Sequence, residues 1–382
     1  ATGVGRLRRP GYTGPLVLGE TFRANKAFST GGEGPNMRLG VFLPNWIGDV
    51  AMATPALRSL RRMVDSSGQG PGQIIGVLRP YVSETLAGTN FLDQQILFDP
   101  RSSDPVLQSG GVIEALRVAQ LDRVTAWLAW RSGAKERLGY DRNGRGILLT
   151  TRLFEPRRGR KLAPLPTIDS YLNLAYAAGG PWETPKLCLA TTPADEAAAD
   201  DVWWRLRLPH GDRVVVLNSG GAFGGAKHWP VEHFAALARK IVEKLGLVVL
   251  VNCGPAERQI ARDIVQQAKR SEVVSLADLD VPLGLSKAII RRARLLVTTD
   301  SGPRYFGVAF GRPVVSLFGP TGIAATRTHY DQERCLSLNL DCSPCMARTC
   351  PLSHHRCMRD LSVEQVFASV QELLQQRVTL AA

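Results

Sequence analysis

From residue 37 onward the chain alternates short apolar segments with segments of helical periodicity. QIIGVLRP, GILLT, RVVVLN, LGLVVLVN and ARLLVTT are continuously apolar, and helical stretches such as VEHFAALARKI stand between them. Strands without polar alternation are buried on both faces, which is typical of parallel sheets covered by helices. The sequence therefore predicts a layered α/β protein, in which GILLT (146–150) is expected to be one of the strands.

The length and one break in this pattern predict two domains. A chain of 382 residues is long for a single core. A helical stretch ends at Gly179-Gly180 and a proline-containing connector follows. We place the boundary near residue 185, between an N-terminal domain (37–185) and a C-terminal domain (186–382) whose last helix is considered able to pack back on the N-terminal domain. Residues 1–36 are rich in Gly, Arg and Thr and are expected to be a disordered leader or a mis-assigned start.

The charge balance predicts an anionic partner. Hydrophobic residues make up 44% of the chain and the formal net charge is +13. No apolar run approaches the roughly 20 residues that cross a bilayer, so we expect a cytoplasmic protein. Nucleic acid, an anionic membrane face and a phosphorylated small molecule would each suit the charge.

Much of the positive charge lies in one segment. Residues 142–161 hold seven basic residues and one acid, Glu155, and end in Arg157, Arg158, Arg160 and Lys161. A solvated loop is the default interpretation of such a run. Since the run lacks the interleaved aromatics of a single-strand stacking platform, we favour peripheral contact with an anionic membrane surface over nucleic acid.

Asp49 in NWIGDV is the first candidate for chemistry. It stands where the first strand passes into its helix, so its carboxylate is expected to face the ligand side of the sheet. A partly buried carboxylate there suits a general base that deprotonates a hydroxyl. The alternative is a helix cap, a common role for Asp.

Two further strands are followed by residues suited to a nucleotide. The glycine-rich turn NSGGAFGGAKHWP carries Lys227, whose charge would suit a diphosphate, although such a turn is often only a loop. Glu257 follows the strand LVVLVN. Its carboxylate could accept hydrogen bonds from ribose hydroxyls, or it could be a solvated charge in the first turn of a helix.

The turn TTDSGPRYFG predicts an anion site. After a buried strand, Asp300, Ser301 and Gly302 form a turn, and Pro303 is expected at the first helical position, where it gives up only an unpaired N–H. The positive end of this helix would stabilise a bound anion such as a diphosphate. Ordinary βα turn chemistry is the alternative.

The tail holds four closely spaced cysteines. Cys342, Cys345, Cys350 and Cys357 occur with two histidines among them. Cys-x2-Cys is an ingredient of a structural zinc site, although the second pair is spaced Cys-x6-Cys. Buried packing thiols are the favoured interpretation, with structural zinc or a redox-sensitive cluster as the alternative.

Together and in this order, the segments resemble one family. The chain resembles glycosyltransferase family nine, and more narrowly the type II lipopolysaccharide heptosyltransferases, over about residues 37–370. The resemblance rests on RLGVFLPNWIGDVAMATPALRSL, GAFGGAKHWPVEHF, TTDSGPRYFGVAFGRPVVSLFGPT and DCSPCMARTCPLSHHRCMRDLSVEQV. It implies a GT-B fold of two Rossmann-like domains, ADP-heptose as donor, the Kdo-containing inner core of lipopolysaccharide as acceptor, and inverting transfer without a metal cofactor.

The resemblance also implies roles for single residues. Asp49 matches the family's catalytic aspartate, Lys227 its phosphate-binding lysine and Glu257 a similarly placed glutamate. On the donor side the pocket would also include Ser219, Gly220, Asp300, Ser301, Gly302, Pro303 and Tyr305. The acceptor would lie against Asn45, Arg157, Arg158, Arg160 and Lys161.

One position departs from the family pattern. Tyr305 stands where much of the family has histidine, and a phenol cannot carry positive charge. Arg304 beside it is a candidate to supply that charge. A glycosyltransferase of the same fold with another nucleotide-sugar donor, and a non-catalytic nucleotide-sugar-binding protein, therefore stay open as alternatives. A monomer is favoured.

Overall fold

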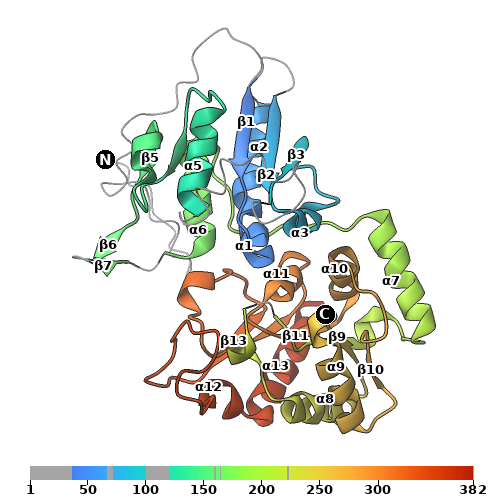
Figure 1. Ribbon diagram of the computed structural model, residues 1–382. Coiled ribbons are helices and arrows are strands. Elements are labelled where there is room, and N and C mark those ends of the chain that lie inside the picture. The colour runs from blue at the N-terminus through green and yellow to red at the C-terminus, as the bar shows by residue number, and fades with distance from the viewer. Residues whose placement is uncertain are drawn as a thin grey trace, which may run out of the picture.

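The computed structural model describes residues 37–66, 72–99, 121–158, 161–163, 165–221 and 223–381. Figure 1 shows two lobes, one above the other. Both are built on parallel strands, and the α/β architecture predicted from the sequence is confirmed. An extended segment, residues 180–192, follows the last helix of the upper lobe and leads into the first helix of the lower one. The predicted boundary near residue 185 falls within this segment.

The upper, N-terminal lobe contains a three-stranded parallel sheet, β1-β2-β3, and a separate parallel pair, β4-β5. Its strands are β1 (Arg38–Phe42), β2 (Gln73–Leu78), β3 (Gln94–Leu97), β4 (Leu138–Tyr140), β5 (Thr151–Leu153) and the antiparallel β6 (Arg157–Arg158) and β7 (Lys161–Leu162). Its helices are α1 (Ile47–Met52), α2 (Thr54–Asp65), α3 (Pro80–Ser83), η1 (Glu84–Leu86), α5 (Leu121–Arg131), η3 (Arg145–Leu148) and α6 (Thr167–Ala177).

One predicted strand of this lobe is wrong. GILLT lies mostly in the 3-10 helix η3, and the strand β5 begins after it, at Thr151. Gly144 precedes η3 with a left-handed φ of 73°, and Gly146 packs directly against the carboxylate of Asp141. These two glycines turn the backbone, so the apolar run cannot extend into a strand until it has passed them.

The lower, C-terminal lobe has a six-stranded, all-parallel sheet in the order β10-β9-β8-β11-β12-β13. The strands are β8 (Val214–Asn218), β9 (Val248–Asn252), β10 (Val273–Ser275), β11 (Leu295–Thr299), β12 (Val314–Phe318) and β13 (Glu333–Ser337). Every residue of β8, β11 and β12 is buried, as their unbroken apolar sequences predict for central strands.

The helices of this lobe form two groups that cover the two faces of the sheet. One group contains α8 (Val231–Leu245), α9 (Arg258–Ala268) and α13 (Val363–Ala381), and the other α7 (Pro193–Arg205), α10 (Leu283–Arg292) and α11 (Gly302–Ala309). Short helical turns complete the lobe: η4 (Gly211–Arg213), η5 (Gly225–Lys227), η6 (Pro255–Glu257), η7 (Ala324–Thr326) and α12 (Arg356–Arg359).

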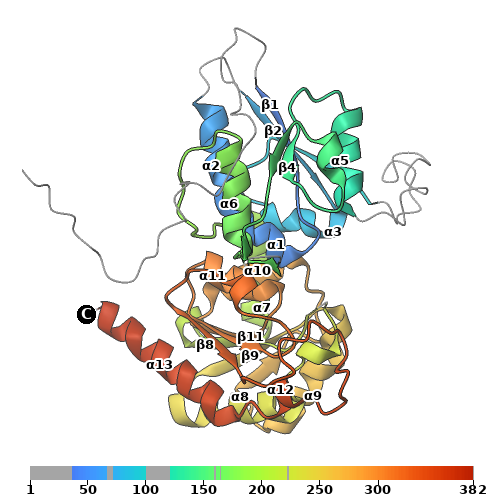
Figure 2. The same cartoon turned by 90° about the vertical axis from the view of Figure 1, so that its left-hand side faces the viewer.

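The last helix packs on its own lobe. α13 contacts α8, β11 and β12, and Figure 2 shows it running along the lower lobe. Its apolar residues Val366, Phe367, Val370, Leu373 and Leu374 are all buried in the core of the lower lobe. The free energy gained by burying this face holds α13 on its own sheet.

A buried lysine joins the two lobes. Lys287 on α10 is fully buried, and its Nζ donates hydrogen bonds to the carbonyls of Glu84 (2.9 Å), Ala87 (3.1 Å) and Ala190 (2.9 Å). The first two carbonyls belong to the upper lobe and the third to the connecting segment. One side chain therefore fixes three parts of the chain at a single point. None of the helices in the described part of the chain is both long and apolar enough to cross a membrane.

Candidate active site

The ends of two strands, one in each lobe, bring their helices into contact. β1 leads into α1 in the upper lobe and β11 leads into α11 in the lower lobe, and α1 packs against α11 (Figure 1). The approach is close: a Cβ on Gly302 would lie 3.0 Å from the side chain of Ile47. The carboxyl ends of parallel strands are the usual ligand-binding edge of such sheets.

Asp49 is the third residue of α1 and is half-buried at this contact. Trp46 is the N-cap of α1 and no side chain caps this helix, so Asp49 is not a helix cap. The pKa of Asp49 is raised from its ordinary 3.8 to about 6, mainly by burial and also by the negative charge of Asp300, while the positive charge of Lys227 opposes both. The structure therefore brings these three charged groups of two lobes together.

Lys227 and Asp300 form a buried ion pair. The Lys227 Nζ lies 2.7 Å from Asp300 Oδ2 and 2.6 Å from the Asp300 carbonyl oxygen. The Thr321 hydroxyl donates a hydrogen bond to the same Oδ2, with an oxygen–oxygen distance of 2.7 Å. Burial alone would raise the pKa of Asp300, but the charges of Lys227 and Arg304 and these hydrogen bonds outweigh it and lower the pKa. Asp300 is thus held ionised beside Asp49.

Arg304 is turned away from the ligand side. Its guanidinium is fully buried and lies 2.6 Å from one carboxylate oxygen of Glu333 and 3.2 Å from the other. It also lies 3.4 Å from Asp300 Oδ1. Its positive charge is thereby paired with two carboxylates, so it serves Asp300 and Glu333 and does not replace the charge of a histidine at position 305.

Tyr305 forms part of the contact between the lobes. Its hydroxyl oxygen accepts a hydrogen bond from Arg304 Nη1 at 3.2 Å, and burial holds the pKa of Tyr305 well above its ordinary value. Its ring lies against the backbone of Gly48, where an added Cβ would be only 2.5 Å from the ring carbon Cε2. No residue with a Cβ fits at position 48 without moving the Tyr305 ring, which explains the glycine there.

The glycine-rich turn lies beside the turn at residues 300–302. The Asn218 amide donates to the Gly220 carbonyl at 3.1 Å and to Ser301 Oγ at 3.2 Å. Glu257 packs onto Gly220, where an added Cβ would lie 2.4 Å from the Glu257 Cγ. The structure thus gathers Gly220, Glu257 and Ser301 at one edge of the sheet.

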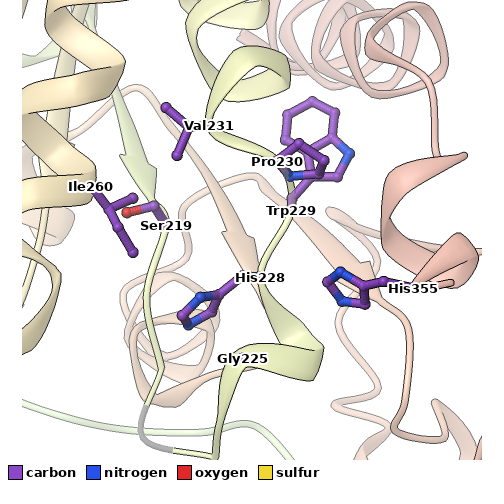
Figure 3. Close-up of a pocket in the computed structure, with 8 residues that line it drawn as sticks. All are labelled: Ser219, Gly225, His228, Trp229, Pro230, Val231, Ile260 and His355. Atoms are coloured by element: carbon purple, nitrogen blue, oxygen red, sulfur yellow. The ribbon is translucent and has the colours of Figure 1, made fainter. Parts of the chain in front are cut away.

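Ser219 faces a cavity at this edge. Its side chain is buried, and the described residues offer no hydrogen-bond partner to its hydroxyl. Figure 3 shows Ser219 on the cavity wall beside Ile260, with His228 and His355 also lining the space. An unpaired hydroxyl in a cavity wall is suited to hydrogen bonding with a bound molecule.

α11 presents its N-terminus at the same place. Ser301 is the N-cap without a side-chain cap, Gly302 is the first helical residue and Pro303 the second, one position later than predicted. Because the first N–H groups of a helix have no partner within it, an anion in this position would be stabilised by them and by the helix dipole.

The family assignment rests on a comparison with known sequence families. Residues 118–355, more than half of the chain, match the family model described as glycosyltransferase family 9 (heptosyltransferase). The chain belongs to glycosyltransferase family 9. This confirms the family resemblance inferred from the sequence.

The first curated relatives of this family 9 glycosyltransferase match it over part of their length. Lipooligosaccharide heptosyltransferase 2 of Campylobacter jejuni is 33% identical over 171 residues, which is 44% of this chain and 54% of the relative. The chain thus spans about half the length of the first curated relatives it matches.

Two solved structures share the fold. The E. coli ADP-heptose lps heptosyltransferase II has a TM-score of 0.68 at 20% identity, covering 89% of this chain and 99% of that one. The family 9 glycosyltransferase from Veillonella parvula has a TM-score of 0.72 at 22% identity, covering 91% and 100%. The predicted GT-B fold is confirmed by these two likenesses.

The predicted acceptor residues are only partly near Asp49. In this glycosyltransferase Asn45 precedes α1, and its amide oxygen accepts a hydrogen bond from Arg79 Nε at 2.9 Å. The β6–β7 hairpin, which includes Arg157, Arg158 and Lys161, lies at the left margin of the upper lobe in Figure 1, apart from α1. Arg157 is exposed there, and Arg160 lies outside the described residues.

The four tail cysteines line one small cavity together with His354 and His355. All are free thiols, and Cys357 is buried beneath Gly319. In the described part of the chain, no three or more His, Cys, Asp or Glu side chains are arranged to hold a metal ion.

Four residues of the site were not predicted: Glu333, which pairs with Arg304, and Trp46, Phe223 and Arg348, which lie together where the two lobes meet. Glu333 opens the last strand, and nothing in DQERCLS marks it as the partner of a residue 29 positions away. For Trp46 and Phe223 a signal was present, since each directly neighbours a segment that was predicted to bind substrate.

Proposed function

We propose that this family 9 protein is an inverting glycosyltransferase that moves heptose from ADP-heptose to the inner core of lipopolysaccharide. The observation that carries the proposal is Asp49, a half-buried carboxyl with a pKa of about 6 that faces the Lys227–Asp300 ion pair of the opposite lobe. A group with this pKa is mostly ionised at neutral pH and is still basic enough to accept a proton in the transition state.

In the proposed reaction one bond forms as another breaks. Asp49 takes the proton of an acceptor hydroxyl, and that oxygen attacks the anomeric carbon of the heptose from the face opposite the diphosphate. The bond between the anomeric carbon and the diphosphate oxygen breaks, and its electron pair leaves with ADP. A single displacement of this kind inverts the anomeric centre.

The leaving diphosphate would be stabilised by groups that are already positioned. Lys227 supplies positive charge, and the N–H groups at the start of α11, near Ser301 and Gly302, supply hydrogen-bond donors. Asp300 and Thr321 hold Lys227 and its surroundings in place. In this proposal transfer proceeds without a metal ion, because the helix end and the lysine supply the positive charge that the leaving group needs.

The nucleoside would lie across the glycine-rich turn. Glu257 beside Gly220 is suited to accept hydrogen bonds from the ribose hydroxyls, and Ser219 would donate to the ligand in the adjoining cavity. The donor and acceptor classes are supported by the E. coli relative, whose name states ADP-heptose and lipopolysaccharide.

Because the proposed acceptor is a lipid-linked saccharide, the enzyme would work on the cytoplasmic face of the inner membrane. In this proposal it works there as a monomer. Support comes from the upper lobe, where α5 contacts η3. Trp130 at the end of α5 is 50% exposed and Ile147 in η3 is 83% exposed. The exposed Arg131 ends α5, and the exposed Arg142, which pairs with Glu155, stands shortly before η3. Aromatic and aliphatic side chains among arginines suit an anionic bilayer surface, where each charge contributes about 1 kcal/mol.

The proposal is tested by ADP release from ADP-heptose with a Kdo-bearing lipid A acceptor. We expect acceptor-dependent release that Asp49→Ala abolishes and that Asp65→Ala, an exposed carboxylate on α2 of the same lobe, leaves unchanged. Donor binding without release would favour a non-catalytic nucleotide-sugar-binding protein. Turnover with another nucleotide sugar but not with ADP-heptose would show that the pocket around Tyr305 selects a different donor.

A further inference from the structure

An arginine that has no carboxylate partner among the described residues lies near aromatic rings of both lobes. Arg348 is exposed, and its guanidinium carbon lies 6.0 Å from the centre of the Trp46 ring and 5.8 Å from the centre of the Phe223 ring. Trp46 belongs to the upper lobe and Phe223 to the lower lobe. Among the described residues no Asp or Glu forms an ion pair with Arg348, in contrast to Lys227 and Arg304.

The backbone at Arg348 is tied to the turn that carries Lys227. The Ala226 N–H donates to the Arg348 carbonyl at 3.0 Å, and the Ala226 carbonyl is hydrogen-bonded by His355 Nε2 at 2.7 Å. Gly224 has a φ of 139° and packs so closely that a Cβ there would lie 2.7 Å from the same Arg348 carbonyl. The cysteine-containing tail therefore fixes the backbone of Arg348 beside the turn that carries Lys227. These are main-chain contacts, so they do not constrain the guanidinium.

Two cations share the Phe223 ring. Lys227 Nζ lies 4.6 Å from the ring centre, and Arg348 lies over the same ring. Lys227 forms an ion pair with Asp300, whereas Arg348 has no ion-pair partner within the described structure. A guanidinium that stacks its faces on aromatic rings keeps its N–H edge available for in-plane hydrogen bonds, which match a carboxylate or a phosphate.

We propose that Arg348 binds a carboxylate of the acceptor saccharide and thereby sets acceptor specificity, an inference that rests on the proposed transferase function. The acceptor hydroxyl must reach Asp49, and Trp46, which contacts Arg348, stands three residues before Asp49 on the same lobe. The diphosphate of the donor already has Lys227 and the start of α11. An acidic sugar beside Asp49 would place its carboxylate against the open edge of Arg348.

The test measures binding of a soluble, deacylated Kdo-bearing acceptor to the ADP-loaded full-length protein by calorimetry. Wild type is compared with Arg348→Ala, Arg348→Lys and the control Arg205→Ala, which removes an exposed charge on α7 away from the cleft. Truncation of the Arg348 side chain leaves its backbone bond to Ala226 intact, so the fold should be preserved. Two modified acceptors are used alongside, one with its carboxyls reduced to alcohols and one with its phosphates removed.

We expect Arg348→Ala to weaken binding of the intact acceptor roughly 10- to 100-fold, the size of one or two charge-assisted hydrogen bonds. Arg348→Lys should give an intermediate loss, because lysine keeps the charge but not the planar fork. The carboxyl-reduced acceptor should bind wild type and Arg348→Ala equally, and the affinity for ADP should not change.

Three results would overturn the inference. The first is that Arg348→Ala binds the intact acceptor as tightly as wild type does. The second is that Arg348→Ala loses affinity for the carboxyl-reduced acceptor but not for the dephosphorylated one. The third is that Arg348→Ala loses affinity for ADP instead of the acceptor. The second would assign the guanidinium to a phosphate and the third to the donor. Because these binding measurements need no turnover, a wild type that binds the acceptor but releases no ADP would contradict the proposed transfer and not the role of Arg348.

Discussion

The environment of Asp49 makes a quantitative prediction about stability. Replacing Asp49 by Asn removes a carboxylate whose ionised form is disfavoured by burial and by Asp300, and only partly favoured by Lys227. The difference between the ordinary pKa of 3.8 and about 6 corresponds to about 3 kcal/mol of unfavourable free energy for the ionised group. Asp49→Asn should therefore raise the free energy of unfolding at neutral pH by up to about 3 kcal/mol.

The direction of the pH dependence follows from proton binding. Between pH 3.8 and about 6 the folded protein holds a proton on Asp49 that the unfolded chain has released. The contribution of Asp49 to stability therefore falls as the pH rises through this window, and it is fully unfavourable above it. The advantage of Asp49→Asn should be complete at pH 7.5 and absent near pH 3.8.

The assay is urea denaturation of wild type, Asp49→Asn and the control Asp65→Asn between pH 4 and 7.5. Activity is measured in parallel: kcat/KM of wild type should fall as the pH drops below about 6, because Asp49 becomes protonated, and Asp49→Asn should lose roughly 100- to 10,000-fold. We therefore expect Asp49→Asn to be more stable and less active than wild type. This combination is typical of a catalytic base whose burial lowers the stability of the protein.

Equal stability of wild type and Asp49→Asn at pH 7.5 would refute the argument, since the carboxylate would then not be desolvated. A variant that keeps wild-type activity would show that Asp49 is not the base. A stability difference of the same size at pH 4 and 7.5 would trace the effect to packing and not to charge.

Three further predictions concern the contact between the lobes and the core beneath it. Gly48→Ala should lower kcat/KM roughly tenfold or more, because its Cβ would lie 2.5 Å from the ring of Tyr305, whereas Gly40→Ala on β1, with no atom within 4 Å, should be neutral in the same steady-state assay. Arg304→Met should lower the free energy of unfolding by about 3–5 kcal/mol, since it leaves a buried carboxylate on β13 without its counter-ion; thermal denaturation equal to wild type would contradict this. Lys287→Met should leave three carbonyls without their donor and cost about 1–3 kcal/mol in urea denaturation, and an unchanged midpoint would show that Lys287 does not hold the lobes together.

Local pattern predicted that several polar segments following different strands would lie near one another. Lys227 and Glu257 after β8 and β9, and the turn of Asp300 after β11, were found from the sequence because parallel topology forces the carboxyl ends of neighbouring strands to one edge. The apolar pattern was wrong for GILLT, where a left-handed Gly144 favours a 3-10 helix over a strand. For α13, an amphipathic pattern shows which face is buried but not which sheet buries it.

By itself, the sequence determined the α/β class and which strand ends carry polar groups. These follow from interactions within about a dozen residues, which residue pattern encodes directly. Only the tertiary structure decided that Asp49 lies near Asp300 and that Tyr305 packs on Gly48. The same is true of the pairing of Arg304 with Glu333, and of the approach of Arg348 to Trp46 of the other lobe. Most of these pairs join residues more than 200 positions apart. Their proximity depends on how two lobes dock and how side chains pack between them, and no local pattern of residues specifies that geometry.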